Sequence, residues 1–179
     1  MLPASIAIIA IVALVVLWVI STHRRLAILD EHIGSAMNQL GLQLSCRFDC
    51  LMSLLELIKG YSQYESEALI KTVSFRRSAI SAKAMPVDVL RQEALISEAL
   101  GWIKMITKEY PELRANPDYI KAMDAIETFD GMVRTSRLIY NDSVARLNRE
   151  IRSFPVSLVA EMFGFRQREY LELKGVADL

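Results

Sequence analysis

The side chains in this sequence whose types and spacing could support chemistry lie among apolar residues, at the three- and four-residue spacing of amphipathic helices. A buried charge is costly unless it is paired and hydrogen-bonded. We therefore expect these groups to satisfy one another across helices and to fix the packing register. The alternative interpretation is a ligand or metal pocket between the helices. This predicted polar core consists of Arg47, Asp49, Glu65, Asp130, Arg137 and Asn141.

Two ion pairs are predicted within the polar core. Arg137 is expected to pair with Glu65 or Asp130, with Asn141 in support. Arg47 and Asp49 are expected to form a similar pair toward the other end of the protein. Such pairs are best attested as devices that fix the register of helical seams.

Metal-binding and nucleophilic patterns are incomplete. Cys46 and Cys50 are the only cysteines, and two thiols without further Cys or nearby His do not complete a zinc site. His23 and His32 lack the glutamate three residues earlier that di-metal carboxylate sites use. We find no Gly-rich phosphate loop, nucleophile elbow or Cys–His constellation. The sequence therefore predicts no catalytic, cofactor-binding or metal-binding residue, and a protein that is not an enzyme.

The first element that must position the polar core is the uncharged apolar run Leu2–Ile20. Roughly 20 apolar residues, rising about 1.5 Å each, match the ~30 Å hydrocarbon core of a bilayer. Arg24 and Arg25 follow the run, whereas a secretory signal carries its charge before the run. Because positive flanks stay in the cytoplasm, we predict an uncleaved membrane anchor with its N-terminus outside.

Small residues recur near this anchor. The alanines of the run are spaced every third residue, and two glycines lie seven residues apart beyond it. Small residues allow helices to approach closely, so they are a candidate self-association face. The alternatives are ordinary lipid-facing alanines and a flexible joint at the glycines. The candidate face consists of Ala4, Ala7, Ala10, Ala13, Gly34 and Gly41.

Prolines mark the expected helix boundaries, because the residue before proline disfavours helical geometry. Asp88 and Asn116 are candidate N-caps, and Gly164 is a candidate C-terminal cap. The expected helices are 21–84, Asp88–Tyr110, Asn116–Phe154 and Pro155–Met162. The expected regions are a membrane anchor (1–22), a juxtamembrane helix continuous with the first bundle helix (23–40), a bundle (41–165) and a C-terminal tail (166–179).

The composition indicates an all-α protein. Helix-forming residues dominate, and no segment shows the alternation of a strand. Short loops between long amphipathic helices predict an antiparallel up-and-down bundle of three long helices and one short C-terminal helix. The 21 basic and 21 acidic residues give zero net charge, which argues against nucleic acid as a partner.

The segment from Gln43 to Tyr61, QLSCRFDCLMSLLELIKGY, resembles the signature of the LemA family. Cys46 replaces one of the usual basic pair, Met52 the proline, and Asp130 a glutamate, while Leu147 stands for a tyrosine. Further matches fall in order as Glu65, Glu109-Tyr110-Pro111, Leu113-Arg114-Ala115-Asn116, Arg137, Tyr140-Asn141, Val144, Asn148, Phe154-Pro155 and Phe163-Gly164-Phe165.

The resemblance implies an anchored helical bundle on the inner side of a bacterial cell (inner) membrane, without an established molecular activity. Relatives of this kind include a protein of magnetosome membranes, and members are often encoded beside a membrane protease. We therefore expect a structural scaffold that contacts the lipid bilayer and forms a homo-oligomer. The alternative is an adaptor that binds or regulates a membrane protein such as a protease.

Overall fold

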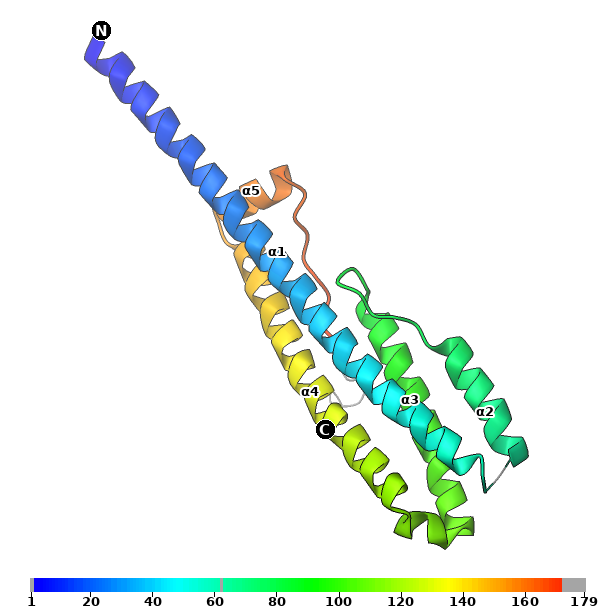
Figure 1. Ribbon diagram of the computed structural model, residues 1–179. Coiled ribbons are helices and arrows are strands. Elements are labelled where there is room, and N and C mark those ends of the chain that lie inside the picture. The colour runs from blue at the N-terminus through cyan, green and yellow to red at the C-terminus, as the bar shows by residue number, and fades with distance from the viewer. Residues whose placement is uncertain (1, 62, 172–179) are drawn as a thin grey trace, which may run out of the picture.

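The computed structural model describes the backbone of residues 2–61 and 63–171, and the side chains of residues 5–61 and 67–171. Within these residues the protein is helical and contains no strand, so the all-α prediction is confirmed. The elements are α1 (Leu2–Ile58), α2 (Gln63–Arg76), α3 (Pro86–Glu109), the 3-10 helix η1 (Pro111–Ala115), α4 (Pro117–Arg152) and α5 (Val156–Met162) (Figure 1).

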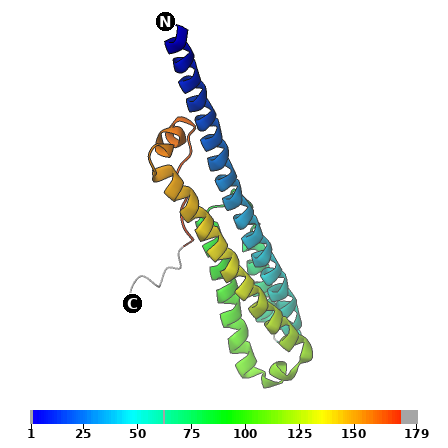
Figure 2. The same ribbon diagram turned by 90° about the vertical axis from the view of Figure 1, so that its left-hand side faces the viewer.

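Helix α1 organises the molecule. It continues for 57 residues without interruption, so the apolar run and the first packed helix are one helix about 85 Å long. Its largest interface is with α4, which lies alongside it, while α2 and α3 cover another side. The N-terminal end of α1 projects beyond all other elements, as both views show (Figures 1 and 2).

The prediction of one helix from Ser21 to Ala84 was wrong. Helix α1 ends at Ile58, and the Tyr61 N–H donates to the Ile58 carbonyl at 2.8 Å in a turn that contains Gly60. The separate helix α2 then reverses direction beside α1 (Figure 1). In α2, Thr72 is exposed and the neighbouring Val73 is buried.

The predicted apolar seams of the long helices do form the core. Three- and four-residue spacing places these side chains on one face of each helix, where neighbouring helices cover them. The buried seam residues include Leu44, Phe48, Leu51, Leu55 and Ile58 in α1, Leu95, Ala99, Ile103 and Ile106 in α3, and Ile126, Val133, Tyr140, Val144 and Leu147 in α4.

Polar caps and prolines account for the helix boundaries. The Asn116 side chain accepts from the Asp118 N–H at 2.9 Å and begins α4, as predicted. Asp88 is not an N-cap: it lies within the first turn of α3 and accepts from the Met85 N–H at 3.0 Å. Gly164 follows α5 with φ 75°, a conformation that favours glycine at a helix C-terminus.

The two glycines of the candidate self-association face contact the protein's own chain. A Cβ at Gly41 would lie 2.4 Å from the carbonyl oxygen of Ile80, in the loop between α2 and α3. A Cβ at Gly34 would lie 3.5 Å from the Cβ of Ala82 in the same loop. Gly41 therefore allows the loop to approach α1, whereas a methyl group at position 34 would make only an ordinary van der Waals contact. A role of the two glycines in self-association stays a prediction.

Replacing Gly41 with alanine is expected to destabilise the fold by about 1–3 kcal/mol, because the added methyl group overlaps a backbone atom. The same change at Gly101, where an added Cβ meets nothing within 4 Å, should stabilise α3 by up to about 1 kcal/mol. Denaturant unfolding of both variants in mild detergent measures the difference. Equal stabilisation by the two alanines would contradict a tight approach at Gly41.

The projecting part of α1 is apolar and uncovered. Apart from the half-buried Val19, its large side chains from Ile6 to Ile20 are 40–68% exposed, and Thr22 is the first buried residue among those described. In the described part of the chain, this is the one helix whose length and composition allow it to cross a membrane. Ala7, Ala10 and Ala13 lie exposed along it, whereas the Ala4 side chain lies outside the described residues.

Candidate functional site

A layer of charged side chains lies where α1, α3 and α4 meet; we call Arg47, Glu93, Asp130, Arg134 and Arg137 the ion-pair layer. Arg47 comes from α1 and is only 8% exposed, and its Nη2 lies 2.8 Å from Oδ1 of Asp130 on α4. Arg134, one turn further along α4, lies on the surface and binds the other oxygen of Asp130 at 2.5 Å. Asp130 is therefore shared by a buried and an exposed guanidinium.

The second pair in the layer joins α4 to α3. The Arg137 guanidinium is also 8% exposed and donates to the carboxylate of Glu93, whose side chain is mostly buried. Burial lowers the pKa of Arg47, and the nearby carboxylates of Asp130 and Glu93 oppose that shift. Glu93 thus lies close to both buried guanidinium groups. The layer balances two buried positive charges with two carboxylates from different helices.

The predicted polar residues are brought together only in part. Arg137 pairs with Glu93, and neither Asp130 nor Asn141 is its partner. Arg47 pairs with Asp130, so the predicted pair with Asp49 was wrong. Asp49 instead accepts from Arg77 at 2.6 Å on the surface. The side chain of Glu65 lies outside the described residues.

The prediction missed Glu93, although its position carries a signal. It stands four residues after Val89 and three before Ile96, both fully buried, so it lies on the packed seam of α3. A charged residue on such a seam needs a buried partner, as do Arg47 and Arg137. That spacing places Glu93 in the polar core.

The chemical capacity of the ion-pair layer is limited by its own pairing. The carboxylates of Asp130 and Glu93 are each bound by guanidinium groups. The Nε atoms of Arg47 and Arg137 are buried without a hydrogen-bond partner among the described residues. No group of three His, Cys, Asp or Glu side chains within the described residues could hold a metal ion. The arrangement is suited to fixing the register of three helices.

The two cysteines lie half-buried and reduced on α1. Burial raises the pKa of the Cys50 thiol, and the neighbouring Cys46 and Asp49 raise it further. A thiol with a raised pKa stays protonated near neutral pH, and the protonated form is a poor nucleophile and metal ligand. In this environment the cysteines act as small packing residues.

A second constellation of polar groups holds the end of the chain. After α5, residues Phe165–Leu171, here called the C-terminal strap, return along α1 and α4. Asn148 donates to the carbonyl of Arg168 and accepts from its N–H, both at 2.9 Å. Asn141 makes the same two bonds to Leu171, at 3.1 and 2.8 Å. Each asparagine side chain thus donates to the carbonyl and accepts from the N–H of one strap residue, as the backbone of a neighbouring β-strand would.

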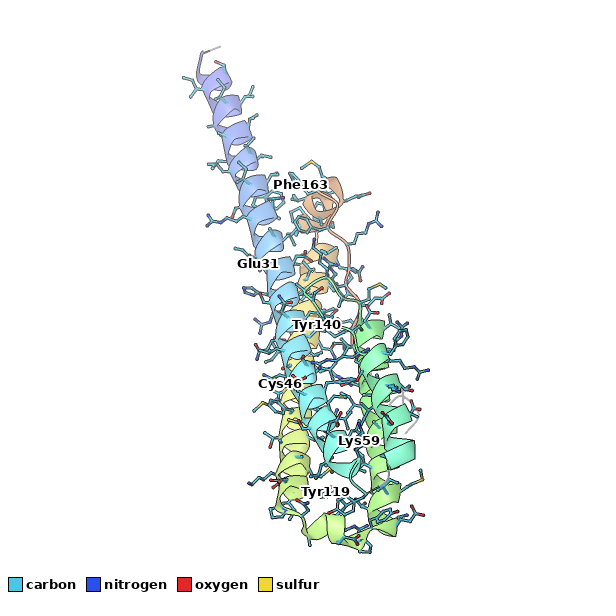
Figure 3. All side chains as sticks on the ribbon, turned by 45° about the vertical axis from the view of Figure 1, so that its right-hand side comes forward. Glu31, Cys46, Lys59, Tyr119, Tyr140 and Phe163 are labelled. Carbon is cyan, nitrogen blue, oxygen red and sulfur yellow. The ribbon has the colours of Figure 1, made fainter. Side chains whose placement is uncertain are left out.

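Further contacts fix the strap on both sides. The Tyr140 hydroxyl donates to the Glu169 carbonyl at 3.0 Å, and Arg168 binds Asp30 of α1 with its Nη2 2.9 Å from Oδ1. Leu171, at the end of the strap, is buried. Figure 3 shows Tyr140 at the level where the strap and the α2–α3 loop approach α1. A cavity of about 700 Å³ lies there, lined by Asp30, Met37, Lys83, Tyr140 and Arg168 among others.

Comparison with known proteins identifies the family of this chain. The family model of the LemA family matches residues 36–178, which include α1 from Ala36 onward and every later helix. The chain belongs to the LemA family. The resemblance noted in the sequence is therefore confirmed, and the LemA-like residues Tyr140, Asn141 and Asn148 are the ones that hold the C-terminal strap.

Two magnetosome proteins of Paramagnetospirillum magneticum, MamQ 1 and MamQ 2, are similar to part of the chain. Each is 28% identical over 80 residues. The similar stretch spans 45% of this chain and 29% of either relative, so the chain covers less than a third of their length. Their names place both relatives in magnetosomes.

A pH test can probe the contact between the strap and Tyr140. Burial raises the pKa of the Tyr140 hydroxyl above its ordinary value; Arg168 opposes this shift and Glu169 adds to it. Because the folded pKa is raised, the unfolded tyrosine ionises first, and stability is lost as the pH rises above about 10. Tyr140→Phe lacks this ionisation but loses about 1 kcal/mol from the missing hydrogen bond.

The stability advantage of the natural protein over Tyr140→Phe is therefore expected to shrink as the pH rises above about 10. Urea unfolding of both proteins across the alkaline range measures this difference, and the common titration of other groups cancels between them. A gap that stays constant with pH would contradict a buried, neutral Tyr140 hydroxyl.

Proposed function

We propose that this protein is a non-enzymatic, membrane-anchored helical scaffold of the bacterial cell membrane. The observation that best supports this proposal is that α1 consists of an uncovered apolar part and a packed part. Its first third is apolar and bare, and the rest of the same helix is packed against α3 and α4. Because both parts belong to one continuous helix, the position and tilt of the bare segment fix those of the packed helices. The packed helices are therefore held at a fixed distance from the surroundings of the bare segment.

The residues flanking the bare segment fit a bilayer. The apolar side chains continue to Ile20, and Trp18 lies near the inner end, where aromatic residues favour the membrane–water interface. Arg24 and Arg25 follow at once, on the side that also carries the packed helices. We infer that the N-terminus is outside and that the helices form a cytoplasmic, antiparallel bundle.

Membrane fractionation and protease protection test this proposal. The full chain should resist extraction from membranes by high salt and alkaline carbonate, and detergent should release it. Protease added to spheroplasts should leave the bundle intact, whereas protease added to inside-out vesicles should degrade it. Release by carbonate, or degradation in spheroplasts, would refute the anchor or its orientation respectively.

Self-association through the anchor is the second part of the proposal. Ala7, Ala10 and Ala13 are exposed on the bare segment, where helices with small residues can approach closely. Crosslinking in mild detergent should capture oligomers of the full chain. Ala10→Leu should reduce that product, whereas Val12→Leu, on the opposite side of the helix, should not. A chain that remains monomeric under all conditions would refute self-association.

An adaptor role is a second candidate, favoured by the cavity of about 700 Å³ between α1, the α2–α3 loop and the C-terminal strap. Its lining carries charges of both signs, from Asp30, Lys83 and Arg168, as a polar site for a segment of a partner would. Co-purification of a membrane partner, such as a protease, from native membranes tests this role. Lys83→Glu should weaken that capture, and unchanged capture would place the contact elsewhere.

A further inference from the structure

Helix α5 presents an apolar face that no part of the described chain covers. Val159 and Ala160 point inward and are buried, so the helix is held firmly against the protein. On the outward side, Leu158 and Met162 are one turn apart and are 60% and 64% exposed, and Phe154, just before the helix, is 83% exposed. Phe163, at the end of the helix, is 49% exposed.

The position of α5 along α1 is defined by aromatic contacts. The His23 ring lies 4.5 Å from the Phe163 ring and 5.6 Å from the Phe165 ring, measured between centroids. All three views place α5 beside α1, at the end of the packed helices from which the bare segment emerges (Figures 1–3). The exposed apolar face is therefore next to the end of the candidate membrane span.

The distance along the α1 axis from the apolar run to His23 indicates what can cover this face. His23 follows Ile20, the last residue of the apolar run, by three residues, which is about 4.5 Å along the helix axis. The headgroup layer on each side of a bilayer is roughly 5–8 Å thick. With the apolar run in the hydrocarbon core, α5 lies at the depth of the headgroups, where short helices with one apolar face are stable.

The charges around α5 also fit a bilayer surface. The exposed guanidinium groups of Arg24, Arg152 and Arg166 lie at this end of the protein, and Glu161 is the only acidic residue in α5. Arg25 is paired with Glu150 at 2.5 Å. Basic side chains close to an anionic membrane surface add roughly 1 kcal/mol of attraction each.

We propose that α5, with Phe154 and Phe163, inserts its apolar face into the headgroup layer of the bilayer crossed by α1. This inference rests on the proposed membrane anchor and adds a second contact with the same membrane. A protein partner fits less well, because stable protein interfaces use roughly 20–30 residues on each side, whereas α5 and the two flanking phenylalanines offer four exposed apolar side chains. Two contacts on different elements fix the rotation of the bundle about α1, which the anchor alone leaves free.

Quenching of tryptophan fluorescence by brominated lipids measures this contact in the full chain. The carrier protein has Trp18→Phe and Trp102→Phe, and Leu158→Trp adds one reporter on the exposed face of α5. A matched control places the reporter at Leu138, which is also exposed but lies 14 residues before the end of α4, or about 21 Å along that helix. A third protein, with Trp102→Phe alone, keeps Trp18 as a reporter of the anchor. The vesicles contain phosphatidylcholine and phosphatidylglycerol, with bromine near the headgroup or near the chain end.

We expect the reporter at position 158 to lose most of its fluorescence with bromine near the headgroup, and less with bromine near the chain end. The reporter at 138 should keep its fluorescence, and Trp18 should be quenched. If Trp18 is quenched and the reporter at 158 is not, the α5 contact is overturned and the anchor stands. If neither is quenched, both proposals are overturned. Equal quenching at 138 and 158 would also overturn the contact, because the whole bundle would then lie on the surface.

Discussion

Replacing Arg137 with alanine is expected to cost about 3–5 kcal/mol of folding free energy, because it leaves the mostly buried Glu93 carboxylate without its partner. Arg137 is the only residue that pairs with Glu93 in the described part of the chain. The loss should appear as a lower urea midpoint when the full chain unfolds in mild detergent, with an unchanged slope. It should also loosen α3, which is joined to α4 through this pair.

Two further variants distinguish the loss of the buried ion pair from the loss of any positive charge on α4. Arg134→Ala removes a guanidinium that is 79% exposed from the same helix and should cost no more than about 1 kcal/mol. Arg137→Met combined with Glu93→Leu removes both buried charges, and it should recover most of the loss, since apolar pairs often replace buried ion pairs without cost. A near-neutral Arg137→Ala would show that Glu93 is solvated and that the layer does not fix the register.

The apolar core could be predicted from spacing alone, because hydrophobic periodicity depends on one helix at a time. Ile126, Val133, Tyr140, Val144 and Leu147 follow one another at spacings of seven, seven, four and three residues, and all are buried on one face of α4. Prolines similarly marked the beginnings of α3 and α4. No proline marks the end of α1. Gly60 is the only helix-disfavouring residue in the turn, and the sequence on either side still favours helix.

The partners within the polar core could not be predicted, because they depend on how one helix slides along another. Arg47 and Asp49 are close in sequence but point to different sides of α1, where Asp130 and Arg77 respectively meet them. Asp130 and Arg137 are seven residues apart and share one face of α4, yet Asp130 meets Arg47 of α1 and Arg137 meets Glu93 of α3. Only the packed register of α1, α3 and α4 assigns the pairs.

The contacts of the C-terminal strap could not be predicted from residue spacing either. Asn141 and Asn148 are seven residues apart and therefore share one face of α4, which the sequence does reveal. Their partners are backbone groups of a segment without regular structure, and no residue type marks such groups. The earlier assignment of Asn141 to the support of Arg137 was wrong for that reason.

Replacing Asn148 with alanine is expected to release the C-terminal strap and to cost on the order of 2–4 kcal/mol, because two hydrogen bonds to the Arg168 backbone are lost together. Asn148 is buried, so no water replaces it while the strap stays in place. The strap would then separate from α4 to hydrate its backbone, and Arg168 would lose its position beside Asp30. Hydrogen exchange of the Arg168 amide should become much faster in this variant, since its N–H is bound to the Asn148 side chain.

Asn38→Ala provides the matched control, because Asn38 is an exposed asparagine within α1. Its replacement should change the stability by no more than about 0.5 kcal/mol and leave the strap amides protected. Asn148→Asp keeps the acceptor for the Arg168 N–H but loses the donor, so the amide should stay partly protected while the stability falls. Unchanged exchange at Arg168 in Asn148→Ala would mean that Tyr140, Asn141 and Asp30 hold the strap without Asn148. In that event the two asparagines do not act as a pair, and the contacts of Asn141, Tyr140 and Asp30 are enough to hold the strap.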